Sequence, residues 1–158
     1  MNTVKLANMI VSLLSGRGCT LSAAESCTGG WFAKSVVDVP GASAVFFGGV
    51  VSYVNAVKEK LLGVREETLA ACTAVSAPVA KEMAEGVRRA CGTDIGISVT
   101  GLAGPGGGSE EIPVGRVFIG YADARGSEAF AFTFEGSRTA VREAAVLAMF
   151  SVLLKKLS

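Results

Sequence analysis

Short apolar segments and helix-like segments alternate along this chain, and that alternation restricts its fold more than any other feature. Residues 19–24, 45–53 and 94–100 are short and largely apolar, as expected of strands inside a sheet. Segments with helical periodicity lie before, between and after them, at 1–15, 31–37, 56–62, 66–71 and 76–90. Because a helix is the usual crossover between parallel strands, this order favours parallel pairing.

The last third of the chain has a different pattern. Two strand-like segments, 114–122 and 127–134, are separated by an Asp-Ala-Arg-Gly turn, which indicates an antiparallel hairpin. The final helix should begin at Ser137 or Arg138 and end near Lys156, and its wide apolar stripe is typical of a deeply buried helix or a subunit contact. The sequence therefore predicts an α/β fold with three α/β/α layers and a mixed, mostly parallel five-stranded sheet.

Composition limits the kinds of partner. Of the 158 residues 50% are hydrophobic, which suits one globular domain spanning residues 1–158. The net charge is +1 and basic residues occur in runs of at most two, so we expect no nucleic-acid binding. No apolar run is long enough to span a bilayer, and residues 1–15 form an amphipathic pattern rather than a signal peptide. We expect a cytoplasmic protein without membrane contact.

The chain contains no histidine and four cysteines, and both counts restrict its chemistry. Without imidazoles, Ser-His-Asp and Cys-His catalysis and histidine-ligated metal sites are excluded. The cysteines lack metal-site spacing, so we expect reduced thiols. Any acid–base step must use Lys, Tyr, Asp, Glu or Cys.

The sequence AESCTGG at 24–30 lies where a strand ends and a helix begins. Ser26 precedes a glycine turn, and the free N–H groups of the new helix favour an oxyanion or a phosphate. Ser26 is thus a candidate nucleophile with stabilising amides beside it. The alternative is that Ser26 or Thr28 only caps the helix.

Three loops should meet at the carboxyl edge of the sheet, where ligands usually bind. They are 26–30, 53–58 and 100–109. The glycine-rich third loop matches neither a P-loop nor a dinucleotide fingerprint, because no Gly-Lys-Ser/Thr follows it and its glycines do not open a helix. It is either a ligand-binding loop or a flexible crossover.

Lys58 is the candidate general base. If Asn55 caps the following helix, Lys58 lies in the first turn, where the helix dipole and burial favour the neutral amine. Tyr53 is placed to relay a proton or to orient Lys58. Alternatively, Lys58 is a solvated surface lysine. Cys27 is a competing nucleophile, and Glu25 either supports the site or pairs with Lys58.

Three motifs in order give the chain a resemblance to a known family. AESCTGG at 24–30, Y-x-N-x-x-K at 53–58 and TGLAGPGGGSEEIPVG at 100–115 resemble the CinA C-terminal-domain family, over about residues 20–142. Its stand-alone members include nicotinamide mononucleotide amidases. The resemblance implies a cytoplasmic, homo-oligomeric bacterial amidohydrolase that needs no metal or other cofactor. It also implies a sheet like that of the anticodon-binding domains.

The resemblance implies roles for individual residues. Ser26 would be the nucleophile and Lys58 its base, with Tyr53 assisting, in the conversion of nicotinamide mononucleotide to nicotinate mononucleotide and ammonia. The implied substrate site, with Arg138 at the phosphate, comprises Cys27, Thr28, Gly29, Gly30, Ser43, Thr100, Gly101, Gly104 and Arg138.

The chain departs from the family pattern at four positions, and two other functions stay open. Val54, Ala56, Ile112 and Ser137 stand where a small polar residue, an acidic residue, a lysine and an aspartate are common. These changes concern substrate affinity rather than the proposed catalytic groups. The alternatives are a non-catalytic module that binds a nucleotide or a partner, as in competence- and damage-inducible proteins, and a Ser-Lys hydrolase of another small amide.

Overall fold

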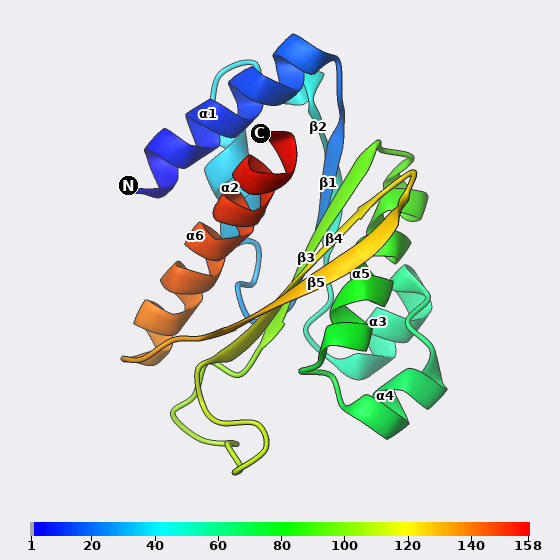
Figure 1. The fold of residues 1–158 in the computed structure, drawn as a ribbon, viewed down its shortest axis with the longest axis vertical. Helices are drawn as coiled ribbons and strands as arrows, with labels where there is room; N and C mark the ends of the chain where they lie inside the picture. The colour runs from blue at the N-terminus through cyan, green and yellow to red at the C-terminus, as the bar shows by residue number, and fades with distance from the viewer. Residues whose placement is uncertain (1) are drawn as a thin grey trace.

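In the computed structural model, which describes residues 2–158, a five-stranded sheet lies between two layers of helices (Figure 1). The strand order is β2-β1-β3-β4-β5. β1 pairs in parallel with β2 and β3, whereas β4 runs antiparallel to β3 and β5. Only β4 is therefore reversed, which confirms the predicted mixed sheet. The strands are β1 (Leu21–Glu25), β2 (Phe46–Val51), β3 (Ile95–Gly101), β4 (Arg116–Asp123) and β5 (Gly126–Thr133).

Three helices cover each face of the sheet (Figure 1), as the alternating pattern predicts. One layer consists of α1 (Thr3–Arg17), α2 (Trp31–Val37) and α6 (Arg138–Leu157). The other consists of α3 (Asn55–Leu62), α4 (Glu66–Cys72) and α5 (Ala77–Cys91). A short 3-10 helix, η1 (Ala42–Ala44), precedes β2.

The helix ends follow the expected signals, with one exception. Ser76 and Ser137 accept hydrogen bonds from the first turns of α5 and α6, and Gly63 ends α3 in the left-handed conformation. The predicted cap of α3 is wrong. Val54, in extended conformation, is the N-cap, and Asn55 is already the first helical residue.

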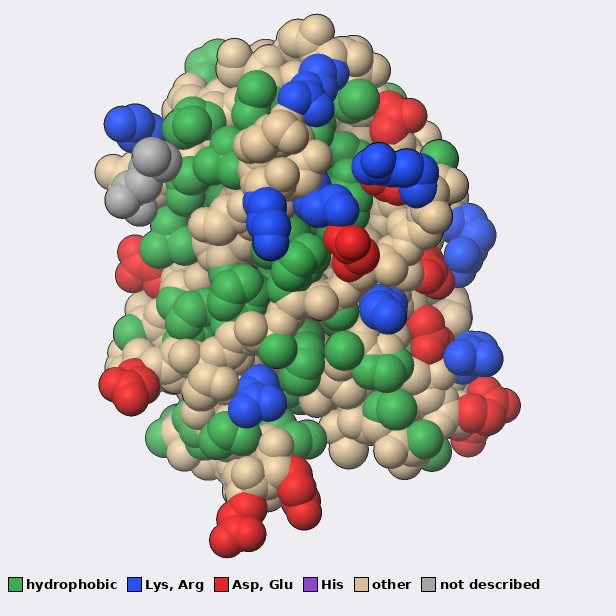
Figure 2. Space-filling model, viewed as in Figure 1, with side chains coloured by type: hydrophobic (Ala, Val, Ile, Leu, Met, Phe, Trp, Pro, Cys, Tyr) green, Lys and Arg blue, Asp and Glu red, His purple; other side chains and the backbone are tan. Residues whose placement is uncertain are grey.

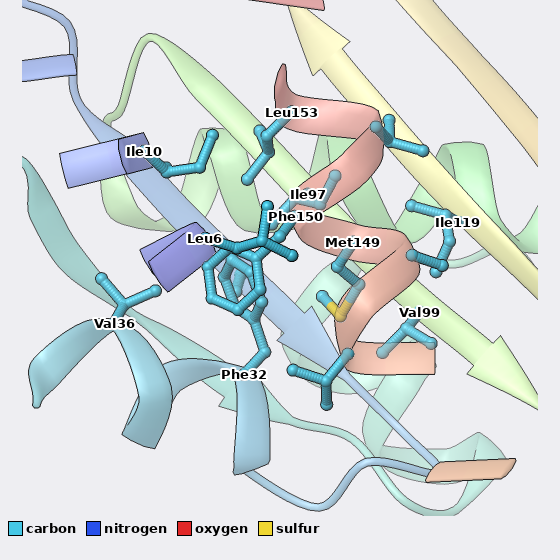
Figure 3. Packing of buried hydrophobic residues seen from close by; sticks show 14 of the residues in the cluster. Leu6, Ile10, Phe32, Val36, Ile97, Val99, Ile119, Met149, Phe150 and Leu153 are labelled. Carbon is cyan, nitrogen blue, oxygen red and sulfur yellow. The ribbon is translucent and has the colours of Figure 1, made fainter. Parts of the chain in front are cut away.

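The larger core lies between the sheet and the layer of α1, α2 and α6. Figure 3 shows Phe32 of α2 against Phe150 of α6, and their ring centroids are 4.7 Å apart. Leu6 of α1 lies beside these rings (Figure 3), and Ile10 of α1 belongs to the same cluster. Burying such a side chain contributes roughly 1.5–3 kcal/mol, so this cluster anchors α2 and with it the turn that follows β1.

The smaller core joins α3 to α5 on the opposite face. Leu62 packs with Met83 and Val87 of α5 and with Ala24 of β1. Gly86 permits the close approach, because a Cβ atom there would lie 1.9 Å from the carbonyl oxygen of Leu62. This contact fixes the position of α3, the helix that carries Lys58.

The surface has no single dominant charge on the face drawn in Figure 2, where basic and acidic side chains are scattered among hydrophobic and neutral ones. The loop from β3 to β4 projects at the lower end of the molecule (Figure 1) and carries the exposed Glu110 and Glu111. Within residues 2–158, none of the helices has the length and apolar character needed to cross a membrane.

Candidate active site

The turn between β1 and α2 places Ser26 directly after a fully buried strand. Ser26 is 6% exposed. Gly29 and Gly30 adopt φ angles of 61° and 101°, which side chains rarely tolerate, and so reverse the chain within two residues. Gly30 is the N-cap of α2, and among the described residues no side-chain hydroxyl caps this helix. The interpretation of Ser26 or Thr28 as the helix cap is therefore wrong.

The buried Glu25 carboxylate binds the N-terminus of α2. It accepts hydrogen bonds from the amides of Phe32 and Ala33, both at 3.0 Å, and from Gly30 at 3.3 Å. It also accepts one from the Thr28 hydroxyl. A carboxylate at this end of a helix is stabilised by the helix dipole. The prediction that these amides remain free for an oxyanion is wrong, and Glu25 faces α2 rather than Lys58.

Lys58 reaches Ser26 from the junction of β2 and α3. Its Nζ lies 3.0 Å from the Ser26 Oγ, 2.8 Å from the Ser52 carbonyl oxygen and 3.4 Å from that of Tyr53. The side chain is only 2% exposed, so its interpretation as a solvated surface lysine is wrong. Burial lowers the pKa of Lys58 below the ordinary 10.5, because the charged amine loses its water.

The two carbonyl oxygens also determine what the amine can do. A carbonyl oxygen only accepts hydrogen bonds, so Ser52 and Tyr53 each take one N–H of Lys58. A neutral amine has two N–H groups and one lone pair. As the ammonium, Lys58 donates its third N–H to the Ser26 Oγ. In the neutral amine the lone pair takes the place of that N–H and can accept from the Ser26 hydroxyl. In this arrangement Lys58 can accept the Ser26 proton.

A cleft of about 260 Å³ lies above this pair. It is formed by the two strand–helix junctions, the glycine-rich loop after β3 and the start of α6. Of the predicted site residues, it brings together Ser26, Cys27, Tyr53, Lys58, Thr100, Gly101, Gly104 and Arg138.

Arg138 bridges the two sides of this cleft. Its guanidinium donates to the Gly104 carbonyl at 2.6 Å and to the Tyr53 hydroxyl at 3.0 Å. The Tyr53 side chain therefore meets Arg138, and only its backbone carbonyl contacts Lys58. The Thr100 hydroxyl donates to the Ala74 carbonyl at 2.8 Å, which ties the end of β3 to the loop before α5.

Four predicted residues lie outside the lining of the cleft. Thr28 is fully buried and donates to Glu25, while Gly29 and Gly30 form the turn into α2. Ser43 is exposed in η1, which precedes β2. Because β1 and β2 are parallel, Ser43 lies at the opposite end of the sheet from Ser26.

The Cys27 thiol lines the cleft but is poorly suited to act as a nucleophile. Burial raises the pKa of Cys27 to about 11. The reactive form of a cysteine is the thiolate, which this environment disfavours. Ser26, next to a buried amine, is the better placed of the two groups.

Sequence reasoning missed Arg142. Its Nε donates to the Cys27 carbonyl at 2.8 Å and a terminal nitrogen donates to that of Thr28 at 3.0 Å. Its guanidinium also lies 5.6 Å from the centroid of the Trp31 ring. The four-residue spacing from Arg138 was the available signal, because it places both side chains on one face of α6.

Comparison with known proteins agrees with the three sequence motifs. A model of the CinA C-terminal domain family matches residues 3–157. The chain belongs to this family. Nicotinamide-nucleotide amidohydrolase PncC of Escherichia coli K12 is 48% identical over 143 residues, which cover 90% of this CinA-family chain and 87% of PncC.

Other CinA-family relatives are longer proteins or solved structures. A putative competence-damage inducible protein of Caldanaerobacter subterraneus is 47% identical over 153 residues, and the chain spans only 37% of its length. The crystal structure of competence damage-inducible protein A from Klebsiella pneumoniae gives a TM-score of 0.96 at 36% identity, with 99% of this chain and 98% of that chain covered. Protein CihA of Agrobacterium tumefaciens gives 0.95 at 36% identity, with 98% and 95% covered.

The positions at which this CinA-family chain departs from the motif pattern lie outside the lining of the cleft. Val54 and Ala56 are exposed at the start of α3, and Ile112 lies in the projecting loop. Ser137 still caps α6, because its Oγ accepts the Ala140 amide at 3.1 Å. The departures thus leave the contact between Ser26 and Lys58 intact.

Proposed function

We propose that this domain hydrolyses the carboxamide of nicotinamide mononucleotide to nicotinate mononucleotide and ammonia. Ser26 is the nucleophile and Lys58 the general base, and the reaction needs no metal. The observation that carries the proposal is the 3.0 Å contact between Lys58 Nζ and Ser26 Oγ, with both groups buried beneath a cleft. The name of the PncC relatives, which the chain nearly matches in length, supports the choice of substrate.

The proposed reaction is acyl transfer in two steps. Lys58 takes the Ser26 proton as Oγ attacks the carboxamide carbon, and the resulting tetrahedral intermediate loses ammonia with the proton that Lys58 returns. Water, deprotonated by Lys58, then attacks the ester, releases the nicotinate and restores Ser26. General-base help is worth about 10²–10⁴-fold in rate, and each oxyanion donor about 10²–10³-fold.

The oxyanion donors in this proposal are the amide of Cys27, which lines the cleft, and the amide of Thr28, the buried residue that follows it. Glu25 engages the amides of Phe32 and Ala33, and the Gly29 amide donates to the Ser26 carbonyl at 3.1 Å. Within the described residues, the N–H groups of Cys27 and Thr28 donate to no oxygen. They follow the nucleophile directly, where acyl-transfer enzymes commonly place such donors.

Arg138 is proposed to bind the substrate phosphate. Its guanidinium lies in the cleft lining, and its partners Gly104 and Tyr53 are neutral acceptors that a phosphate can replace. Thr100 and the loop that follows it complete the proposed nucleotide site.

We further propose that the domain acts as a homo-oligomer in the cytoplasm, where pyridine nucleotides are recycled. β2 is an edge strand, since within the part of the chain that the structure describes it pairs with β1 alone. Phe47 and Val51 on this strand are 56% and 52% exposed, and β2 contains no charged residue. An uncharged apolar edge favours pairing with another chain, which supports self-association.

Ammonia release from nicotinamide mononucleotide tests the proposed reaction. Ser26→Ala and Lys58→Met should each lose at least about 10²-fold in kcat, because each removes a reacting group. Lys60→Met is the control, since Lys60 is an exposed lysine on the same helix. The wild-type rate should be unaffected by a chelator.

Three outcomes would contradict the proposal in different ways. An unimpaired Ser26→Ala enzyme would reject the nucleophile. Binding of the mononucleotide without ammonia release would indicate a non-catalytic module. Turnover of other small amides but not of the mononucleotide would reject the substrate and leave the Ser26–Lys58 pair standing.

A further inference from the structure

The turn that carries the proposed nucleophile is held by Arg142 from α6. The guanidinium binds two successive carbonyl oxygens, that of Cys27 at 2.8 Å and that of Thr28 at 3.0 Å. Its position is fixed by the ring of Trp31, 5.6 Å away. Arg142 is half-buried and does not line the cleft, so it acts on the turn rather than on a bound substrate.

Peptide geometry links these carbonyl oxygens to the neighbouring amides. In a trans peptide the N–H points opposite to the C=O of the same unit. Because the Cys27 carbonyl points to the Arg142 guanidinium, the Thr28 N–H points away from that guanidinium. A flipped peptide would exchange the two groups and present a carbonyl oxygen where the donor now lies.

The charge of Arg142 also acts through the peptide bond. A cation that binds a carbonyl oxygen polarises the peptide and strengthens its N–H as a donor. The same cation partly offsets negative charge that develops nearby. Both effects favour an oxyanion at the Thr28 amide.

We infer that Arg142 is a positioning residue for the amidase reaction, which orients the Cys27–Thr28 peptide so that its N–H, and not its carbonyl oxygen, faces the reacting group. This inference rests on the proposed function. Glu25 supports the same turn by accepting a hydrogen bond from the Thr28 hydroxyl. The turn is thus held by the Arg142 guanidinium at two carbonyl oxygens and by the Glu25 carboxylate at the Thr28 hydroxyl.

Arg17 provides a matched control. It also donates from a guanidinium nitrogen to a backbone carbonyl, that of Leu157. This contact ties α1 to the end of α6 and lies outside the cleft. Arg17→Met therefore removes a comparable contact without touching the proposed site.

Steady-state kinetics of Arg142→Met, Arg142→Lys and Arg17→Met test the inference. Loss of one oriented oxyanion donor should lower the kcat of Arg142→Met by about 10²-fold, with KM changed by less than about threefold. Arg142→Lys should be intermediate, because lysine keeps the charge but cannot bind two carbonyls as a planar fork. Arg17→Met should keep the wild-type kcat.

A fluorophosphonate probe that labels Ser26 separates this inference from the choice of substrate. The attack of Ser26 on the phosphorus of the probe also develops negative charge on an oxygen. If the wild type labels but releases no ammonia from nicotinamide mononucleotide, the substrate proposal fails, and the labelling rates still test Arg142. The inference would be overturned if Arg142→Met kept the wild-type kcat and labelling rate, or if only its KM rose. It would also be overturned if Arg17→Met lost as much kcat as Arg142→Met. Should Arg142→Met not fold, wild-type labelling by Arg142→Lys would overturn it.

Discussion

The amine of Lys58 is buried and has no carboxylate partner among residues 2–158, and this sets the pH at which it can work. Its hydrogen-bond partners are one hydroxyl and two carbonyl oxygens, and burial lowers its pKa from 10.5. A general base acts in its neutral form, which is populated above its pKa. Lowering that pKa moves the active range toward neutral pH.

We expect kcat/KM for ammonia release to rise with pH through a single ionisation whose midpoint lies below 10.5. The pH–rate profile of the wild type measures this midpoint. Cys27→Ser is the control, because the Cys27 thiol has its own raised pKa of about 11. A midpoint at or above 10.5, or one that disappears in Cys27→Ser, would contradict the assignment to Lys58.

At the scale of helices and strands, the contact between α3 and α5 decides where Lys58 lies. Gly86→Ala should destabilise the protein by about 1–3 kcal/mol, because the new Cβ overlaps the Leu62 carbonyl and pushes α3 away. The displaced helix should also lower amidase activity. Gly16→Ala in α1 is the control, since among the described residues no atom outside its own stretch of helix lies within 4 Å of its Cβ position, and alanine favours helix by about 0.5–1 kcal/mol. Chemical unfolding measures the free energy of unfolding of both variants. Equal values for Gly86→Ala and the wild type would contradict this prediction.

The elements were largely predictable from the sequence, whereas their terminal contacts were not. The helical period of the apolar residues and the capping serines predict α5 and α6, because Ser76 and Ser137 accept hydrogen bonds from the first turns of these helices. No local rule shows that Glu25 folds forward onto the amides of Phe32 and Ala33. Likewise, the rule that the carboxyl ends of parallel strands meet at one edge predicts that Ser26 and Lys58 lie at the same end of the sheet. Their direct contact depends on how α3 packs against α5, which the hydrophobic pattern of the sequence does not predict.

At the scale of the whole molecule, β2 leaves one edge of the sheet open to another chain. If that edge mediates self-association, Phe47→Lys should shift the protein toward the monomer, because a charge on an edge strand opposes pairing. Light scattering after size-exclusion chromatography measures the mass. Val4→Lys is the control, since Val4 is 65% exposed on α1. A monomeric wild type, or an unchanged mass in Phe47→Lys, would contradict the proposal.

The parallel register of β1 and β2 sets Glu25 opposite Val51, one residue before Ser26 and Ser52. The alcohol, the amine and both carbonyls that aim the amine thus belong to one continuous stretch, from residue 21 to residue 62. This stretch is therefore a candidate segment for transfer into another protein. A host sheet that reproduced this pairing would also need a counterpart of α5 to fix α3, and counterparts of α1 and α6 to anchor α2 and the turn after β1.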